Sequence, residues 1–157
     1  MKTKKLLLDI DDDEEEIHVG LLRLAKELPD YEFFYHLNHC NSFKFARIQD
    51  FVYHGMYYDY YFPRFEAYYS DSRVCIHFIA NRSIESIQKK VSSELFFTEE
   101  ETHFLLNHFQ EVNYLIKTSE PFDDFSLILL PENLTFPVQN FQLSPEEDLY
   151  QLFQYYE

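Results

Sequence analysis

One histidine- and cysteine-containing segment has a spacing that could hold a metal ion. His36, His39 and Cys40 form a His-x-x-His-Cys pattern, and on a helix the two histidines share one face. A structural zinc site needs four ligands, however, and the other cysteine of the chain lies far along the sequence. We therefore interpret the segment as two surface histidines near the C-terminal end of a helix, where the helix dipole favours them.

Two acidic patterns have part of a metal-binding spacing. Asp9, Asp11 and Asp13 alternate as at the start of an EF-hand calcium loop, but the position that requires glycine holds a glutamate. Glu100 and His103 have the Glu-x-x-His spacing of half a di-iron carboxylate site, but a second pair and four long helices are missing. We expect no metal and no other cofactor.

The patterns of nucleophilic and nucleotide-dependent catalysis are missing from the sequence. It has no Gly-x-Ser-x-Gly elbow, no phosphate-binding loop and no dinucleotide fingerprint. Carboxylates are so numerous that the sequence cannot select an acid–base pair among them. We expect no catalytic residue and a protein that is not an enzyme, with an enzyme of unrecognised class as one alternative.

The most unusual stretch is rich in tyrosine and covers residues 53–69. Tyrosine supplies a large, rigid contact area with a polar tip, and protein interfaces use it heavily. Since neighbouring residues of a strand face opposite sides, one row of phenols is expected at the surface as a protein-binding interface. The alternative is that 13 tyrosines and 17 phenylalanines fill the core of a chain without tryptophan. The candidate interface residues are Tyr57, Tyr58, Tyr60, Tyr61, Tyr68 and Tyr69.

The charge balance narrows the choice of partners. The chain has 13 basic and 28 acidic residues, a formal net charge of −15. Phosphate backbones and anionic membranes repel such a surface, so we expect neither direct nucleic-acid binding nor membrane binding. A basic protein partner would be attracted, and a homodimer is the other possibility for the aromatic surface. An acidic nucleic-acid mimic, which would bind a basic nucleic-acid-processing protein, is a further alternative.

The elements that must position these residues form one domain over residues 1–157. We predict an α+β fold, a mainly antiparallel β-sheet of five to seven strands with two or three packed helices, including a C-terminal helix. Apolar alternation and apolar runs predict strands at 6–10, 17–22, 43–51, 53–69, 74–80, 112–117 and 138–143. Pro63 is expected to mark a sheet edge or a break. For residues 125–130, the length of the apolar run is compatible with either a strand or a helix.

Three helices are predicted from capping signals. One begins at Asp30 as N-cap, one covers 99–109 after a capping box of Thr98 and Glu101, and one follows Ser144 as N-cap. Cys40 and Cys75 are expected as free, buried thiols of a cytoplasmic protein, since the apolar run near the N-terminus is too short for a signal peptide.

Several landmarks resemble the IPExxxVDY family of Bacteroidota, which is named after its own signature. The signature corresponds to Leu106-Asn107-His108, three further residues and Val112-Asn113-Tyr114, so its spacing and its apolar and aromatic ends are kept. The central Pro-Glu pair is replaced by Asn107-His108, and the Asp by Asn113. The segments that are also similar are Val19-Gly20-Leu21, the Asp30-Tyr31 helix with Leu37-Asn38, and Phe78-Ile79-Ala80-Asn81-Arg82-Ser83. The resemblance implies a small cytoplasmic bacterial protein without an assigned activity, cofactor or catalytic residue.

Overall fold

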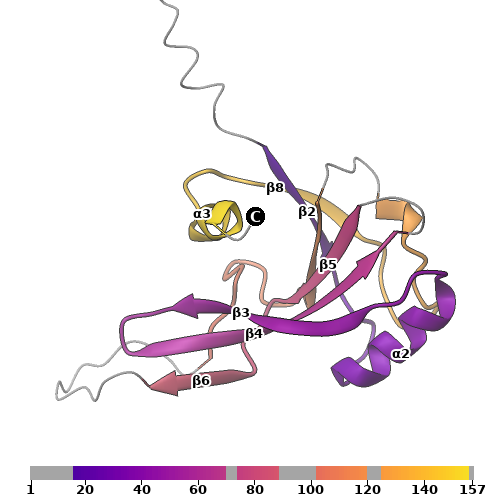
Figure 1. Ribbon diagram of the computed structural model, residues 1–157, viewed down its shortest axis with the longest axis horizontal. Helices are drawn as coiled ribbons and strands as arrows, with labels where there is room; N and C mark the ends of the chain where they lie inside the picture. The colour runs from indigo at the N-terminus through magenta and orange to yellow at the C-terminus, as the bar shows by residue number, and fades with distance from the viewer. Residues whose placement is uncertain (1–15, 70–73, 89–101, 120–124, 156–157) are drawn as a thin grey trace, which may run out of the picture.

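An antiparallel β-sheet with a helix on each face is the framework of the protein (Figure 1). The computed structural model describes residues 16–69, 74–88, 102–119 and 125–155. Within these ranges there are seven strands, two α-helices and one 3₁₀ turn. The strands are β2 (Ile17–Leu22), β3 (Ala46–His54), β4 (Tyr58–Tyr68), β5 (Cys75–Ala80), β6 (Glu85–Gln88), β7 (Tyr114–Thr118) and β8 (Gln139–Leu143). The helices are α2 (Asp30–Cys40) and α3 (Asp148–Tyr155), and the 3₁₀ turn is η1 (Phe125–Leu127).

The strand order is β3-β4-β5-β7-β2-β8, and β6 pairs with the first half of β4. Every pairing is antiparallel. The predicted α+β class, the strand number and the C-terminal helix are thus confirmed. The sequence pattern did not predict β6, whose residues are mostly exposed.

The sheet buries a hydrophobic core on each of its faces. On one face α2 inserts Phe33, Phe34 and Leu37 against Phe65 and Phe78 of the sheet. On the other face α3 packs residues of its own apolar stripe against the sheet and against the loop before β7 (Figure 1). That second core contains Val19, Leu21, Phe51, Phe62, Ile79, Leu106, Val112, Leu149, Tyr150 and Phe153. β5 buries residues on both of its faces, which follows from this double coverage.

Pro63 lies inside β4, which continues through it. Since proline has no backbone N–H to donate, the hydrogen-bond ladder must be interrupted beside it, and the neighbouring strands show that interruption. On one edge of β4, Tyr58–Tyr61 pair with β6 and Arg64–Tyr68 pair with β5. Pro63 lies between these two ranges, where the partner strand changes. Toward β3, the pairing shifts between Ile48 and Phe51, which is a β-bulge opposite the proline.

Two predictions at helix starts are wrong. Asp30 is the first helical residue, Pro29 takes the N-cap position, and the Asp30 carboxylate instead accepts a hydrogen bond from the Tyr114 hydroxyl. After Ser144 a turn comes first and α3 begins at Asp148, although the Ser144 hydroxyl accepts a hydrogen bond from the backbone N–H of Glu146.

The predicted helix over 99–109 is also wrong for residues 102–109. These residues form turns and an isolated bridge between Phe104 and Arg82. Residues Thr98 and Glu101 of the proposed capping box lie outside the described residues, as do the predicted strand at 6–10 and the calcium-like pattern of Asp9, Asp11 and Asp13. Across the described part of the chain, the helices are too short or too polar to span a bilayer.

Candidate functional site

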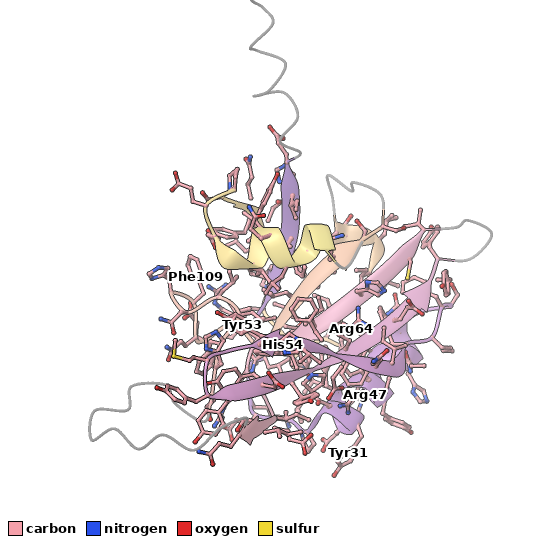
Figure 2. All side chains as sticks on the ribbon, turned by 60° about the vertical axis from the view of Figure 1, so that its left-hand side comes forward. Tyr31, Arg47, Tyr53, His54, Arg64 and Phe109 are labelled. Atoms are coloured by element: carbon pink, nitrogen blue, oxygen red, sulfur yellow. The ribbon has the colours of Figure 1, made fainter. Side chains whose placement is uncertain are left out.

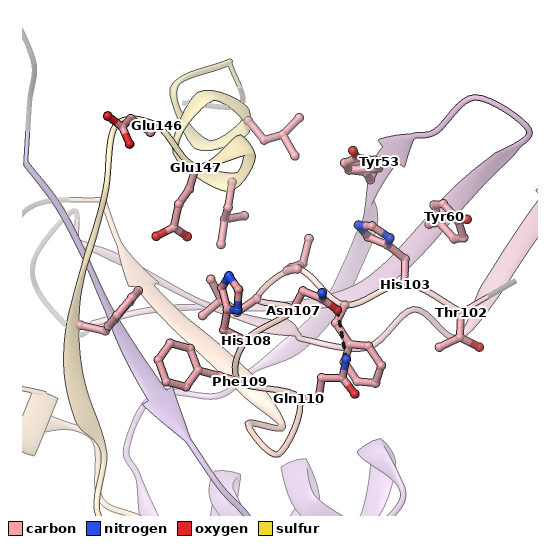
Figure 3. A pocket seen from close by; sticks show the side chains of 16 residues that line it. Tyr53, Tyr60, Thr102, His103, Asn107, His108, Phe109, Gln110, Glu146 and Glu147 are labelled. Carbon is pink, nitrogen blue, oxygen red and sulfur yellow. Dashed lines mark hydrogen bonds between the residues drawn. The ribbon is translucent and has the colours of Figure 1, made fainter. Parts of the chain in front are cut away.

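A half-open groove of about 890 Å³ lies on the α3 face of the sheet (Figure 3). It is lined by residues of the loop before β7, of the first part of α3 and the stretch before it, and of β3, β4 and β8. The apolar and aromatic residues among its lining are Tyr53, Tyr60, Phe104, Leu105, Leu106, Phe109, Phe141, Leu149 and Leu152. Its polar lining residues are Thr102, His103, Asn107, His108, Gln110, Glu146 and Glu147. The groove thus combines an apolar floor with polar walls.

The His103 ring lies across two tyrosines of the β3–β4 hairpin. Tyr53 and Tyr60 are paired across these strands, and His103 stacks on them with ring centroids 4.6 Å and 4.9 Å away. The interplanar angles are 28° and 25°. Such stacking orients the imidazole with one face against the phenols, at the end of the groove where Figure 3 shows the three rings together.

The loop wall is fixed by Asn81, which follows β5 and is 0% exposed. Its side-chain N–H groups donate to the carbonyl oxygens of Phe109 at 2.9 Å and Val112 at 3.1 Å, and its side-chain oxygen accepts from the N–H of Leu106 at 2.8 Å. Its backbone adds two bonds to the same loop, one with Leu105 and one with Asn113. One buried amide therefore satisfies backbone groups that a helix would have paired internally.

Ser83 fixes the beginning of the same loop. Its backbone N–H donates to the His103 carbonyl at 2.9 Å, and its hydroxyl accepts from the His103 N–H at 3.0 Å. Together with Asn81, this two-point contact explains why residues 102–109 are not helical. The backbone of the loop is hydrogen-bonded to Asn81 and Ser83 after β5 instead, and the His103 ring lies over the two tyrosines.

Two carboxylates stand at the α3 side of the groove. Glu146 and Glu147 precede the helix, where acidic side chains interact favourably with the helix dipole. Figure 3 shows Glu147 extending toward the loop that carries His108. Phe109 and Phe141, with ring centroids 5.3 Å apart, close the floor below them. In Figure 2, Phe109 and Tyr53 lie on the same side of the molecule, next to α3.

The tyrosines predicted as an interface do not form one surface row. Tyr60 is 1% exposed and lines the groove, and Tyr58 packs against the core beside it. Tyr69 packs against the core on the α2 face, and Tyr57 and Tyr61 are half-buried. Tyr68 is 61% exposed at the far end of β4. Within β4, the alternation of the strand places Tyr58, Tyr60 and Tyr68 toward one face of the sheet and Tyr61 toward the other.

A second polar cluster lies on the same face of the sheet, away from the groove. Glu66 on β4 pairs across the strands with His77 on β5, and Cys75 precedes His77 by two residues. The His77 Nε2 atom lies 2.9 Å from a Glu66 carboxylate oxygen and 3.3 Å from the Cys75 sulfur, and that sulfur lies 3.3 Å from the same oxygen. Among the described residues, these three are the one group of three or more potential ligands whose atoms converge.

The cluster also changes the proton affinities of its members. The hydrogen bond from His77 lowers the pKa of the Glu66 carboxyl below its usual value. Burial, together with the hydrogen bond to Glu66, raises the pKa of the Cys75 thiol to about 12. A thiol with such a pKa is a poor nucleophile at neutral pH, which argues against cysteine catalysis at this position.

The predicted His36, His39 and Cys40 pattern does not converge in this way. The His39 ring lies 2.8 Å from the carbonyl oxygen of Tyr35 and is exposed, as expected for a surface histidine near a helix end. Both cysteines are free, with Cys75 buried and Cys40 only half-buried. The sequence reasoning missed the Glu66, Cys75 and His77 cluster, although Cys-x-His on a strand places both side chains on one face.

Comparison with protein-family models, curated proteins and solved structures finds no match for this chain.

Proposed function

We propose that this protein is a non-enzymatic interaction module, and that its groove binds a short segment of a basic partner protein that carries apolar side chains. The observation that carries the proposal is the combination of an apolar floor with two carboxylates at one wall of the same groove. A cytoplasmic setting is part of the proposal, supported by two cysteines that remain unpaired.

The groove floor supports binding of apolar side chains. Tyr53, Phe109, Phe141 and Leu152 line it and are each only partly buried. Covering such surface removes apolar area from water, which stabilises a complex by roughly 25 cal/mol for each square ångström. Aromatic anchors in such a pocket are the residues that carry most of the binding energy in protein interfaces.

Charge supports a basic segment over an acidic one. The chain has a formal net charge of −15, so its long-range field attracts cationic partners. Glu146 and Glu147 place two of those acids at the groove itself, where they can pair with a lysine or arginine that flanks an apolar anchor. Since such pairs remain near solvent, they contribute more to association rate and specificity than to affinity.

The fixed loop supports a preformed site. Asn81 and Ser83 hold the loop by hydrogen bonds to its backbone, so little conformational entropy has to be lost when a ligand binds. The segments that carry the resemblance to the IPExxxVDY family meet at this wall, because Asn81 is hydrogen-bonded to Leu106 and Val112 of the signature-like stretch. Membership of that family remains a proposal.

The test uses fluorescent peptides of equal length in which leucine and phenylalanine alternate with lysine or arginine. Fluorescence anisotropy at low and high salt measures their affinity for the full chain, and acidic versions of the same peptides serve as the reference. The Glu146→Gln/Glu147→Gln variant is expected to bind the basic peptides several-fold more weakly at low salt, and to have a shallower salt dependence. The matched control, Glu27→Gln/Glu132→Gln, has the same net charge but changes exposed carboxylates that do not line the groove.

Equal binding of acidic and basic peptides would exclude the proposed partner class. Equal loss in both double variants would show that only net charge matters and that the groove is not the site. Sedimentation of the free protein tests the homodimer. If a second copy filled the groove, dimerisation would compete with the peptide, and peptide binding would depend on protein concentration.

A further inference from the structure

We propose that Glu66, Cys75 and His77 form a three-ligand site for a divalent transition-metal ion of the zinc class. The site is separate from the groove, because none of its residues lines that groove, and it does not depend on the function proposed above. One oxygen, one sulfur and one nitrogen would hold the ion.

The three ligand atoms already surround a common point. They are separated by 2.9 Å, 3.3 Å and 3.3 Å. Around a tetrahedral zinc, with bonds of about 2.0–2.3 Å, such atoms lie roughly 3.3–3.7 Å apart. The side chains would therefore have to move apart by no more than about half an ångström. In the structure described here, hydrogen bonds occupy the space that the ion would fill.

The ligand set selects the class of ion. Calcium and magnesium prefer oxygen ligands alone, whereas a thiolate and an imidazole favour zinc and related transition metals. Binding replaces the proton on the Cys75 sulfur with the ion, and that proton leaves to solvent. The His77 ring ligates through Nε2 as the neutral tautomer with its proton on Nδ1, so the Nε2 hydrogen bond to Glu66 is given up. The protein then supplies a thiolate, a neutral imidazole and a carboxylate, a combination that is balanced in charge against the ion.

The geometry fits a metal site better than a catalytic relay. A nucleophilic relay needs one imidazole nitrogen for the thiol and the other for the carboxylate. Here the single Nε2 atom of His77 is within reach of both Cys75 and Glu66. Three ligand atoms that are all close to one another are expected around a shared ion.

The sheet fixes the backbones that carry the ligands. Glu66 and His77 are direct cross-strand partners, and Cys75 lies on the same face because it is two residues away on β5. The Cys75 N–H donates to the Ser119 hydroxyl at 2.9 Å, and the Cys75 carbonyl accepts from the Ser119 N–H at 2.9 Å. Sites on strands hold their geometry more precisely than sites on loops.

The surroundings leave the site reachable. The side chains of Glu66 and His77 are each 26% exposed, so an ion can enter and a solvent ligand can take the fourth position. Two cations lie near the site. The Arg64 guanidinium is engaged by the carbonyl oxygen of Gln49, and the Lys117 ammonium lies over the Phe153 ring, 5.7 Å from its centroid. The Arg64 charge also interacts favourably with the ionised forms of Glu66 and Cys75, so a bound ion has to compete with it.

Cobalt titration of the full chain tests the proposal, because Co²⁺ substitutes for zinc and reports its ligands by colour. Tetrahedral binding with a thiolate is expected to give visible d–d bands and a sulfur-to-cobalt charge-transfer band, both saturating at one ion per chain and bleached by added zinc. The Cys75→Ser variant is expected to lose the charge-transfer band, and Glu66→Gln and His77→Gln to weaken binding by about tenfold or more. The matched control Cys40→Ser, which changes the other thiol, is expected to bind as the wild type does.

Absence of the charge-transfer band in the wild-type protein would overturn the proposal. So would a band that persists in the Cys75→Ser variant, or one that disappears in the Cys40→Ser variant. If the Cys75→Ser variant fails to fold, the rate of cysteine alkylation in the wild-type protein provides a second test. Zinc is expected to slow alkylation of Cys75 by iodoacetamide at least about tenfold and to leave the Cys40 rate unchanged, as read by mass spectrometry of the peptides. Equal alkylation of Cys75 with and without zinc would exclude the site.

Discussion

The side-chain oxygen of Asn81 accepts a hydrogen bond from the backbone N–H of Leu106 at 2.8 Å, which ties the end of β5 to a loop 25 residues later in the chain. The other half of the same amide donates to two carbonyl oxygens of that loop. The groove wall therefore depends on a residue that does not itself line the groove. This dependence can be measured separately from any ligand.

Replacing Asn81 by alanine should destabilise the protein strongly. The change leaves one N–H and two carbonyl groups of the loop without their partner, at about 1–3 kcal/mol for each group that stays buried. We expect urea unfolding to show a loss of about 3 kcal/mol or more in the free energy of unfolding. Asn107→Ala is the control, since Asn107 is exposed in the same loop, and its effect should stay within about 0.5 kcal/mol. Similar losses in both variants would contradict the role assigned to Asn81.

Phe109→Ala should weaken binding of the basic peptides by about tenfold, which corresponds to about 1.4 kcal/mol. Phe109 lines the groove and packs edge-to-face on Phe141, so its removal takes away part of the apolar floor. Phe136→Ala is the matched control, because Phe136 is an exposed phenylalanine outside the groove. Anisotropy titrations of both variants should show a change for Phe109 alone; an effect of equal size at Phe136 would point to a different binding surface.

Gly20→Ala should destabilise the sheet by about 1–3 kcal/mol, because a Cβ atom at Gly20 would lie 2.7 Å from the Cγ1 atom of Val138. The added methyl group has no room between β2 and the chain that leads into β8. Val138→Ala removes the atom in conflict, so Gly20→Ala should cost less in that background. Thermal unfolding of the two single variants and the double variant measures this coupling. Strict additivity would show that the conflict lies elsewhere.

Tyr114→Phe should change how stability depends on pH in alkaline solution. Burial, together with the nearby Asp30 carboxylate, raises the pKa of the Tyr114 hydroxyl above its ordinary value. The folded protein therefore keeps this proton where the unfolded chain loses it, above pH of about 10, and stability falls as the pH rises further. Without this hydroxyl the decline should be shallower by up to about 1.4 kcal/mol per pH unit.

The same Tyr114→Phe variant should also be less stable near pH 7, by roughly 1–2 kcal/mol, because the hydrogen bond to Asp30 is lost. Tyr35→Phe, at an exposed tyrosine, should alter neither quantity. Denaturant titrations between pH 7 and 11 check both expectations. If the alkaline slopes of wild type and Tyr114→Phe coincide, Tyr114 already ionises in the folded protein.

Local patterns were sufficient to predict most of the framework. The predicted strand at 17–22 coincides with β2, and the predicted helix at Asp30 coincides with α2, which buries Phe33, Phe34 and Leu37 on one face. The helix predicted after Ser144 corresponds to α3, which begins a few residues later at Asp148. The hydrophobic pattern of a short segment is sufficient to predict the secondary structure of that segment.

The candidate sites depended on information that no local window contains. Residues 102–109 follow the capping-box pattern of Thr98 and Glu101, but their backbone is bound by Asn81 and Ser83, about 20 residues earlier. The cluster of Glu66 with His77 depends on the register between β4 and β5, which pairs residues that are 11 positions apart in the chain. The division of the tyrosines between two faces required knowing that both faces of the sheet are covered.

The bulge in β3 also affects how the molecule behaves in crowded solution. Among the described strands, β3 lies at one edge of the sheet, and its bulge opposite Pro63 interrupts the row of backbone groups that a second chain could use for edge-to-edge pairing. At the other end, β8 has only five residues and exposes Gln139, Asn140 and Gln142. The bulge and the short polar strand therefore disfavour edge-to-edge pairing at two edges of the described sheet, in a chain in which 19% of the residues are aromatic.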